Sequence, residues 1–324
     1  MANIIKKINY FFKETFELLK AAVQGFSTDK VPKLSSSLAY VTLFSITPLL
    51  TILIAAVSLI YKEDFHQQFF AQLTSLFGDE KIPKAIEGFL TEAKLSGKST
   101  IALVIGIISL FIGATAVFTE IQDSINTIWN VKAVPKKGWK KFITNRLLSF
   151  SLIISLGFLM MVTLVISSLL VALQQELQQY LPFSSILLFQ GISLAISFIV
   201  ITLLFAVIFK VLPDVRLKWK PALIGAGFTA ILFMIGKYII QLYITQTHTG
   251  AVFGAAGSVV VLMVWIYYTS LILYFGAEFT EAYAERYKMR IQPSRYAVHL
   301  KTVVEEEEVS TLPLQSEKKA GNNS

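Results

Sequence analysis

Residues 257–279 of the chain read GSVVVLMVWIYYTSLILYFGAEF, and Glu278 is the one charged residue in this stretch. An α-helix needs ~20 residues to cross the ~30 Å of hydrocarbon in a bilayer, and this stretch is longer than that. Its aliphatic and aromatic residues fall on every face of a helix, so no polar face is left for water. The stretch therefore predicts a membrane-spanning helix.

Five similar runs precede it. The six runs are 36–60, 99–121, 147–173, 185–209, 221–244 and 257–279. Of the 324 residues 54% are hydrophobic, and the mean hydropathy is +0.63, which is typical of a membrane protein. The sequence thus predicts an all-α fold, a polytopic bundle of six transmembrane helices.

Lysine and arginine gather on alternate sides of these runs. They are frequent before the first run, between the second and third, between the fourth and fifth, and after the sixth, whereas segments 174–184 and 245–256 contain none. By the positive-inside rule both termini are cytoplasmic. The net charge of +8 then predicts contact with anionic lipids at the cytoplasmic face, not with nucleic acid.

Three parts are expected along the chain. Residues 1–35 hold a cytoplasmic amphipathic helix, which lies along the membrane surface or docks on the bundle. Residues 36–283 form the six-helix membrane domain. Within it, the outer loop 61–98 has two amphipathic stretches that lie on the bilayer, cap a vestibule or bind an envelope protein. Residues 284–324 are expected to be a cytoplasmic, largely disordered tail, because they are polar and poor in aromatic residues.

No catalytic or metal-binding pattern is present in the sequence. The chain has no cysteine, and its three histidines, His66, His248 and His299, fall in separate segments outside the runs. It also lacks a phosphate-binding loop and a nucleophile-elbow motif. We therefore expect no cofactor, no metal ion and no enzymatic activity.

Three charged residues inside the runs are candidates for function. Lys237 falls in the outer half of the fifth run, where it contacts an anionic headgroup or substrate, or extends its amine towards the interface. Glu120 and Glu278 fall near the cytoplasmic ends of their runs. We expect interhelical ion pairs there, with Arg146 and Lys210 at the same level, in preference to a proton relay.

Proline and glycine mark further candidate positions. Pro48 should kink the first helix, as a hinge or as a fixed packing feature. Gly254 and Gly257 make the entry to the sixth helix small, which allows close helix packing or a re-entrant turn that faces substrate. Gly225, Gly227 and Gly236 predict a fifth helix packed tightly against a neighbour.

Several short motifs occur in a recognisable order. They are Ser37-Leu-Ala-Tyr40 before Pro48, Asn126-x-x-Trp129, Leu212-Pro213 before Trp219, Gly254-x-x-Gly257, Trp265-Ile-Tyr267 and Gly276-Ala-Glu278. Over about residues 10–290 they resemble the YihY/BrkB family of bacterial inner-membrane proteins. Ile46-Thr47 and Phe253 depart from the expected pattern. The resemblance implies a six-helix protein of the inner membrane and marks Tyr40, Asn126, Trp129, Pro213, Trp265, Tyr267 and Gly276 as motif residues.

Three functions follow as hypotheses. The favoured one is a transporter or flippase-like exporter of an envelope component, and the alternative is a membrane scaffold or assembly factor. The third is a membrane-bound ribonuclease, a label that the family has carried beside one for virulence. Nuclease chemistry needs clustered carboxylates or a histidine pair, and the cytoplasmic segments offer only the scattered Asp123 and Asp214.

Overall fold

The computed structural model describes residues 2–60, 100–134, 184–247, 257–294 and 296–301. Within these ranges lie six helices and four short strands. The helices are α1 (Ala2–Thr28), α2 (Val31–Ile60), α5 (Thr100–Ile128), α7 (Ser184–Val211), α8 (Trp219–Thr247) and α10 (Gly257–Arg286). The strands are β1 (Val131–Ala133), β2 (Val215–Arg216), β3 (Gln292–Pro293) and β4 (Ala297–His299).

The predicted helical membrane protein is confirmed in its main features. Within the described part of the chain, three helical segments are long and apolar enough to cross a membrane: Gly191–Val211, Trp219–Ile240 and Val259–Arg286. They correspond to the fourth, fifth and sixth runs. The first and second runs fall in α2 and α5, and the third run and the loop 61–98 lie outside the described residues.

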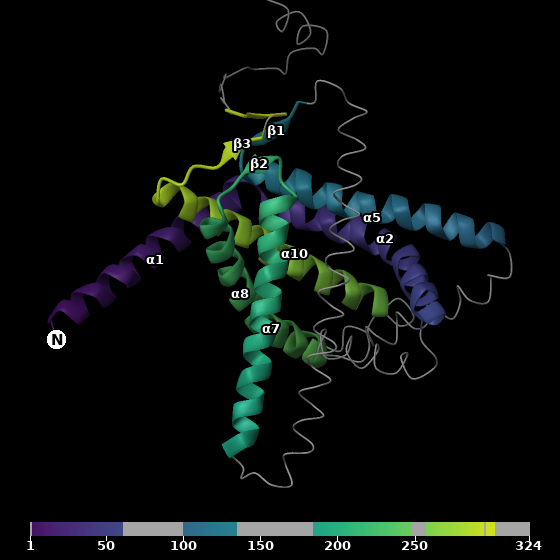
Figure 1. Cartoon of the computed structure of the whole chain (residues 1–324), viewed down its shortest axis with the longest axis horizontal. Helices are drawn as coiled ribbons and strands as arrows, with labels where there is room; N and C mark the ends of the chain where they lie inside the picture. The colour runs from purple at the N-terminus through teal and green to yellow at the C-terminus, as the bar shows by residue number, and fades with distance from the viewer. Residues whose placement is uncertain (1, 61–99, 135–183, 248–256, 295, 302–324) are drawn as a thin grey trace, which may run out of the picture.

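Helix α10 is the centre of the arrangement. It packs against α1, α2, α5 and α8, while α2 also packs on α5 and α7 on α8. Figure 1 shows α2 and α5 running side by side, α1 projecting away from the other helices, and β1, β2 and β3 gathered at one end. The largest apolar core lies near that end, where Ile125, Phe209, Leu217 and Tyr274 are buried.

The expectation of a disordered tail from residue 284 is corrected over residues 284–301. Helix α10 continues to Arg286, and β3 and β4 follow it. β4 pairs antiparallel with β1, with Val131 opposite His299, and β3 pairs with β2, with Val215 opposite Pro293. These strands are too short to show a periodic pattern, and their partners lie far away in the sequence. Residues 302–324 lie outside the described ranges.

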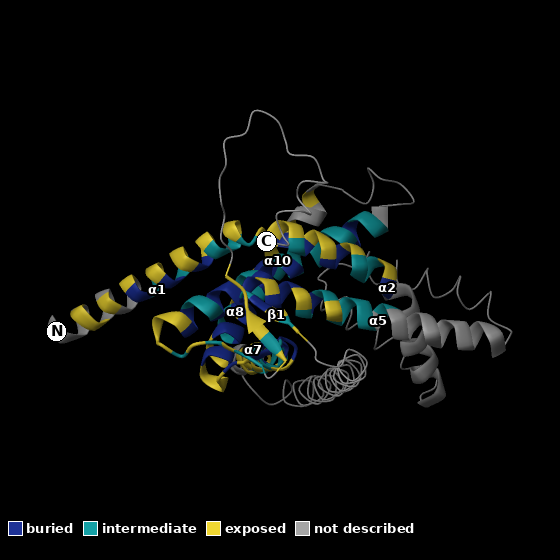
Figure 2. Ribbon diagram, turned by 90° about the horizontal axis from the view of Figure 1, so that it is seen from above, coloured by how far each residue is buried: buried dark blue, intermediate teal, exposed yellow. Residues whose placement is uncertain are grey.

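Helix α1 docks on α10 by one of its faces. Leu18 and Ala22 pack against Phe279 and Tyr283 of α10. Phe16 remains 66% exposed on the opposite side of the helix. Figure 2 shows the exposed and buried faces alternating along this helix. Docking on the bundle and an apolar outer face thus occur together in α1.

Candidate functional site

Glycine and threonine residues bring α8 and α10 into very close contact. A Cβ at Gly225 would overlap Thr280 Oγ1, and one at Gly276 would overlap Thr229 Oγ1. Further along, a Cβ at Gly236 would lie 2.8 Å from Tyr268 Cε1. The predicted tight packing of the fifth helix is confirmed for Gly225 and Gly236. Gly227 has more room, because the nearest atom to its added Cβ would be Phe198 Cζ at 4.0 Å.

The motif residue Asn126 binds the loop between α7 and α8. Its Nδ2 donates to Asp214 Oδ2 at 3.0 Å, and its Oδ1 accepts from the Asp214 backbone N–H at 2.8 Å. Gln122, one turn earlier on α5, donates to the same carboxylate at 3.1 Å. The Asp214 carbonyl accepts in turn from the Ser294 N–H at 2.9 Å. One loop thus links α5 to the segment that follows α10.

Trp129 makes a second link from α5. Its indole Nε1–H donates to the carbonyl of Ala277 in α10 at 3.1 Å, and the ring is 2% exposed. Pro213, from the Leu212-Pro213 motif, is buried beside this junction. The buried polar contacts of Asn126 and Trp129 fasten the ends of α5, α7 and α10 to one another.

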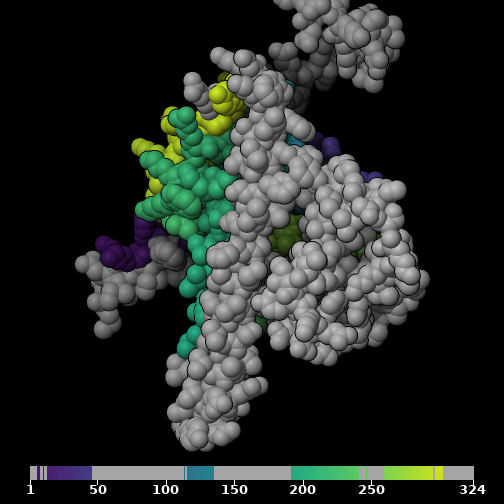
Figure 3. Space-filling view, turned by 45° about the vertical axis from the view of Figure 1, so that its right-hand side comes forward, coloured from purple at the N-terminus to yellow at the C-terminus, as the bar shows by residue number. Residues whose placement is uncertain are grey.

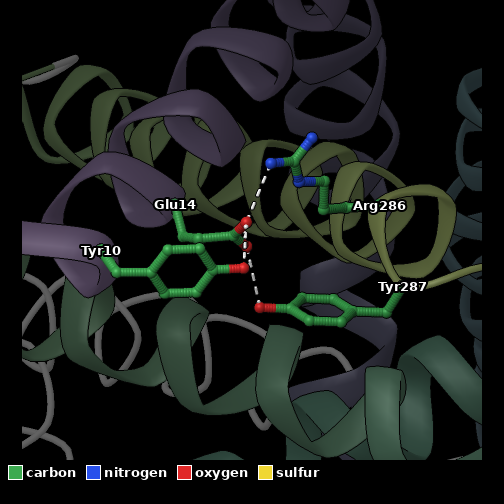
Figure 4. Close-up of polar contacts among 4 residues, drawn as sticks. All are labelled: Tyr10, Glu14, Arg286 and Tyr287. Carbon is green, nitrogen blue, oxygen red and sulfur yellow. Dashed lines mark hydrogen bonds and ion pairs between the residues drawn. The ribbon is translucent and has the colours of Figure 1, made fainter. Parts of the chain in front are cut away.

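A polar cluster joins the middle of α1 to the end of α10 (Figure 4). Glu14 Oε1 accepts from Arg286 at 2.8 Å and from the Tyr10 hydroxyl at 3.0 Å, and Oε2 accepts from the Tyr287 hydroxyl at 3.0 Å. These donors, Arg286 first, hold the pKa of Glu14 below its usual range. The same bonds raise the pKa of Tyr10 and of Tyr287. Sequence reasoning missed this cluster, since Glu14 and Arg286 are 272 residues apart.

Glu278 is buried between α10 and the end of α1. The side chain is 3% exposed, and its Oε2 occupies the space that a Cβ at Gly25 would fill. Its carboxyl lies close to the carboxyl of Asp29. Of the two cations expected near Glu278, Lys210 donates to the Leu217 carbonyl instead, with its Nζ 5.7 Å from the Trp219 ring. Arg146 lies outside the described residues.

Glu120 lies on α5 close to a buried tyrosine. The charge of Glu120 acts on this tyrosine, Tyr274, which is fully buried. The Tyr274 hydroxyl lies near Ser124. Neither the Tyr274 hydroxyl nor Ser124 Oγ makes a hydrogen bond to another described residue. The same holds for Thr202 on α7 and Thr269 on α10. Several polar groups are thus buried among these apolar helices without a hydrogen-bond partner in the described part of the chain.

The other predicted site residues are dispersed. Lys237 is half-buried, and its Nζ lies 5.8 Å from the centre of the Tyr238 ring. Trp265 is buried and packs edge-on against Phe233, with 6.4 Å between the ring centres. Tyr40 is 61% exposed, with its ring tilted against that of Phe44, and Tyr267 is half-buried. Helix α2 continues through Pro48 as one helix. Gly257 begins α10, and Gly254 lies outside the described residues.

The described residues include no group of three or more histidine, aspartate or glutamate side chains placed to hold a metal ion. The polar side chains that the structure does bring together carry carboxyl, hydroxyl, amide, indole and guanidinium groups. They can donate and accept hydrogen bonds and hold or release protons.

The sequence matches known proteins over most of its length. The family described as virulence factor BrkB matches residues 22–299. A UPF0761 membrane protein of Psychromonas ingrahamii is 31% identical over 86% of this chain and 91% of its own length. One of Pseudomonas paraeruginosa is 30% identical over 82% of this chain and 62% of its own length.

One of Janthinobacterium sp. is 27% identical over 82% of this chain and 59% of its own length. The chain therefore spans about three fifths of the length of the Pseudomonas and Janthinobacterium relatives. No solved structure matches it. Because the match to the family extends from α1 to β4, the chain belongs to the BrkB family of membrane proteins.

Proposed function

We propose that the chain is a transporter or flippase-like exporter of an envelope component in the bacterial inner membrane. It crosses the membrane six times, with both termini in the cytoplasm. The observation that supports this function is a set of buried polar atoms inside apolar helices that have no hydrogen-bond partner among the described residues. They occur on four of the described helices, at Ser35 of α2, Ser124 of α5, Thr202 of α7, and Thr269, Tyr274 and Glu278 Oε1 of α10.

Such groups lower the stability of the fold. A buried polar group without a hydrogen bond costs ~1–3 kcal/mol, and a fully apolar helix would avoid that cost. Three of the groups lie at successive positions along α10, from Thr269 in its middle to Glu278 near its end. A polar or amphiphilic substrate that passes along α10 would supply the missing partners in turn. Transport thus gives these groups a role that packing alone does not.

Two surface features support a lipid partner. Figure 3 shows the atoms of α7 and α8 forming a continuous surface. Apolar side chains such as Leu194, Ile235 and Tyr238 are more than half exposed there, which suits contact with lipid tails. Exposed basic residues lie at or beyond the ends of these helices, where anionic headgroups would bind them: Arg216, Lys218 and Lys220.

A scaffold or assembly factor is the second candidate. Asn126 and Trp129 tie the ends of α5, α7 and α10 together through buried hydrogen bonds, which favours a static junction at that end. An envelope protein would bind through residues 61–98, which lie outside the described residues. A ribonuclease is the least favoured candidate, since Asp123 is exposed and Asp214 is hydrogen-bonded to Asn126 and Gln122.

Reconstitution in liposomes separates these candidates. Fluorescent phosphatidylglycerol and phosphatidylethanolamine are placed in the inner leaflet, and their arrival in the outer leaflet is followed with a membrane-impermeant quencher. We expect movement with the wild-type chain and slower movement with Tyr274→Phe, Thr269→Val and Lys237→Ala. Tyr296→Phe is the matched control, because Tyr296 is 51% exposed outside the helices.

Two results would count against transport. One is the absence of lipid or solute movement in wild-type vesicles, and the other is wild-type rates for all three helix variants. Crosslinking in cells that recovers one stoichiometric envelope protein, lost when residues 61–98 are deleted, would support the scaffold instead.

A further inference from the structure

Two carboxyl groups, from Asp29 and Glu278, lie close together where the turn between α1 and α2 contacts α10. Asp29 lies in the turn between α1 and α2, its N–H donating to the Gly25 carbonyl at 2.8 Å. Glu278 reaches the same point from α10, and a Cβ at Gly25 would lie 2.9 Å from its Cδ. Because Gly25 has no side chain, the Glu278 carboxyl can lie against the backbone of α1.

The Glu278 carboxyl is enclosed by protein. The residue is 3% exposed, and its Oε1 has no hydrogen-bond partner among the described residues. The other charged groups that act on this carboxyl are Asp29 and Glu281, and both are acidic. Glu281 is in turn close to Glu285, which is exposed. In the described part of the chain the nearby Arg286 is engaged with Glu14 and Lys210 with the Leu217 carbonyl.

This arrangement requires a positive charge. An ionised carboxylate only accepts hydrogen bonds, so two of them cannot bond to each other. Two adjacent carboxylates removed from water repel strongly, and such pairs retain one proton between them. Asp29 and Glu278 form such a pair, because the Glu278 carboxyl is enclosed by protein and the Asp29 carboxyl lies close to it.

We propose that Asp29 and Glu278 form a proton-binding site, in which one shared proton holds the α1–α2 turn against α10. Burial raises the pKa of Asp29, which agrees with a proton retained at this position. Release of the proton leaves two negative charges in contact and pushes the turn away from α10. The Glu14 cluster binds α1 to α10 at a separate point and does not depend on this proton. The site rests on the enclosed Glu278 carboxyl, which lies against Gly25 one turn before Asp29, and it does not need the transport function.

Infrared spectroscopy of the full chain in lipid nanodiscs tests the site directly. A protonated carboxylic acid has a carbonyl-stretch band apart from that of a carboxylate, and it shifts in heavy water. At pH 7 exposed aspartate and glutamate are ionised, so a remaining band reports enclosed, protonated groups. We expect this band in the wild-type chain, its loss in Glu278→Gln and its loss or displacement in Asp29→Asn. Glu285→Gln is the control, because this exposed residue lies on the same helix, and it should leave the band unchanged.

Three outcomes would overturn the proposal. The first is the absence of the band from the wild-type spectrum at pH 7. The second is a band that Glu278→Gln and Asp29→Asn both leave in place. The third is a carboxylate spectrum that changes with sodium, potassium or magnesium and shows no protonated band, which would indicate a cation site. Asp29 lies in a half-buried turn, so the fold should tolerate Asp29→Asn. This variant therefore still tests the site if Glu278→Gln does not fold.

Discussion

Gly225 of α8 touches Thr280 of α10 so closely that a Cβ at Gly225 would overlap the threonine hydroxyl. Further along the pair the contact recurs with the roles exchanged, as Thr229 lies against Gly276. Each hydroxyl donates to a carbonyl of its own helix, Thr280 to Gly276 and Thr229 to Gly225, both at 2.7 Å. The threonines therefore pack as small side chains with satisfied hydroxyl groups, and the two helix backbones can approach closely.

A methyl group at Gly225 should weaken this contact. Its Cβ would also lie 2.8 Å from Thr280 Cβ, so α8 and α10 would have to move apart. We expect Gly225→Ala to reduce the free energy of unfolding by ~1–3 kcal/mol. Thermal unfolding in detergent measures the effect. Gly227→Ala is the matched control, expected to be neutral or stabilising by up to ~1 kcal/mol, and equal losses in both variants would argue against close packing at Gly225.

Removing the Asn126 side chain should loosen the loop that carries Asp214. Asn126→Ala deletes two hydrogen bonds, at 3.0 and 2.8 Å, and leaves the Asp214 N–H without that partner. We expect a loss of ~1–3 kcal/mol of stability. Hydrogen exchange should accelerate in β2 and β3, since the same loop binds Ser294. Thr127→Ala, at an exposed neighbour on α5, should leave that exchange unchanged.

Trp129 should stabilise the fold through its indole N–H donor as well as through the bulk of its ring. Trp129→Phe keeps an aromatic ring but removes the bond to the Ala277 carbonyl, at 3.1 Å. We expect a loss of ~1–2 kcal/mol, because the bond is fully buried. Chemical unfolding followed by circular dichroism would measure it. Trp219→Phe provides the comparison, since Trp219 is 56% exposed and its loss should cost little.

Docking of α1 on α10 through Glu14 should depend on pH. The pKa of Glu14 is lowered in the fold, so its contribution is present above the pKa of the unfolded chain, ~4.3, and disappears as the pH falls through the folded value. The pKa values of Tyr10 and Tyr287 are raised, so their contribution is present below ~10 and disappears as the pH rises through their folded values.

Spin labels on α1 and α10 measure this docking. The chain contains no cysteine, so a pair of cysteines introduced on exposed faces labels only the intended positions. We expect one interhelical distance near neutral pH and a longer one in acid. Glu14→Gln should abolish the change in acid, while Glu17→Gln, at an exposed position, should keep it. A distance that is independent of pH in the wild-type chain would contradict the prediction.

The sequence foretold some contacts of this fold and missed others. Small residues in an apolar run predict close helix packing, and this holds at Gly225 and Gly236 but not at Gly227. The partner of Glu278 was not foreseen. Its expected neighbours were cations at the same membrane depth, whereas the rotation of α10 turns the carboxyl towards Gly25 and Asp29. A sequence predicts the depth of a residue in the membrane, but it does not predict which face one helix turns towards another.

The sequence by itself determined the class of the protein, its long helices and the membrane as its environment. These properties depend on local composition, because each apolar run is already long enough to span hydrocarbon. Only the tertiary structure decided that Glu14 meets Arg286, that Asn126 holds Asp214 and that the segment after α10 forms strands. These partners are 88 and 272 residues apart in the two side-chain pairs. Such contacts arise from the packing and rotation of whole helices, which no local pattern encodes.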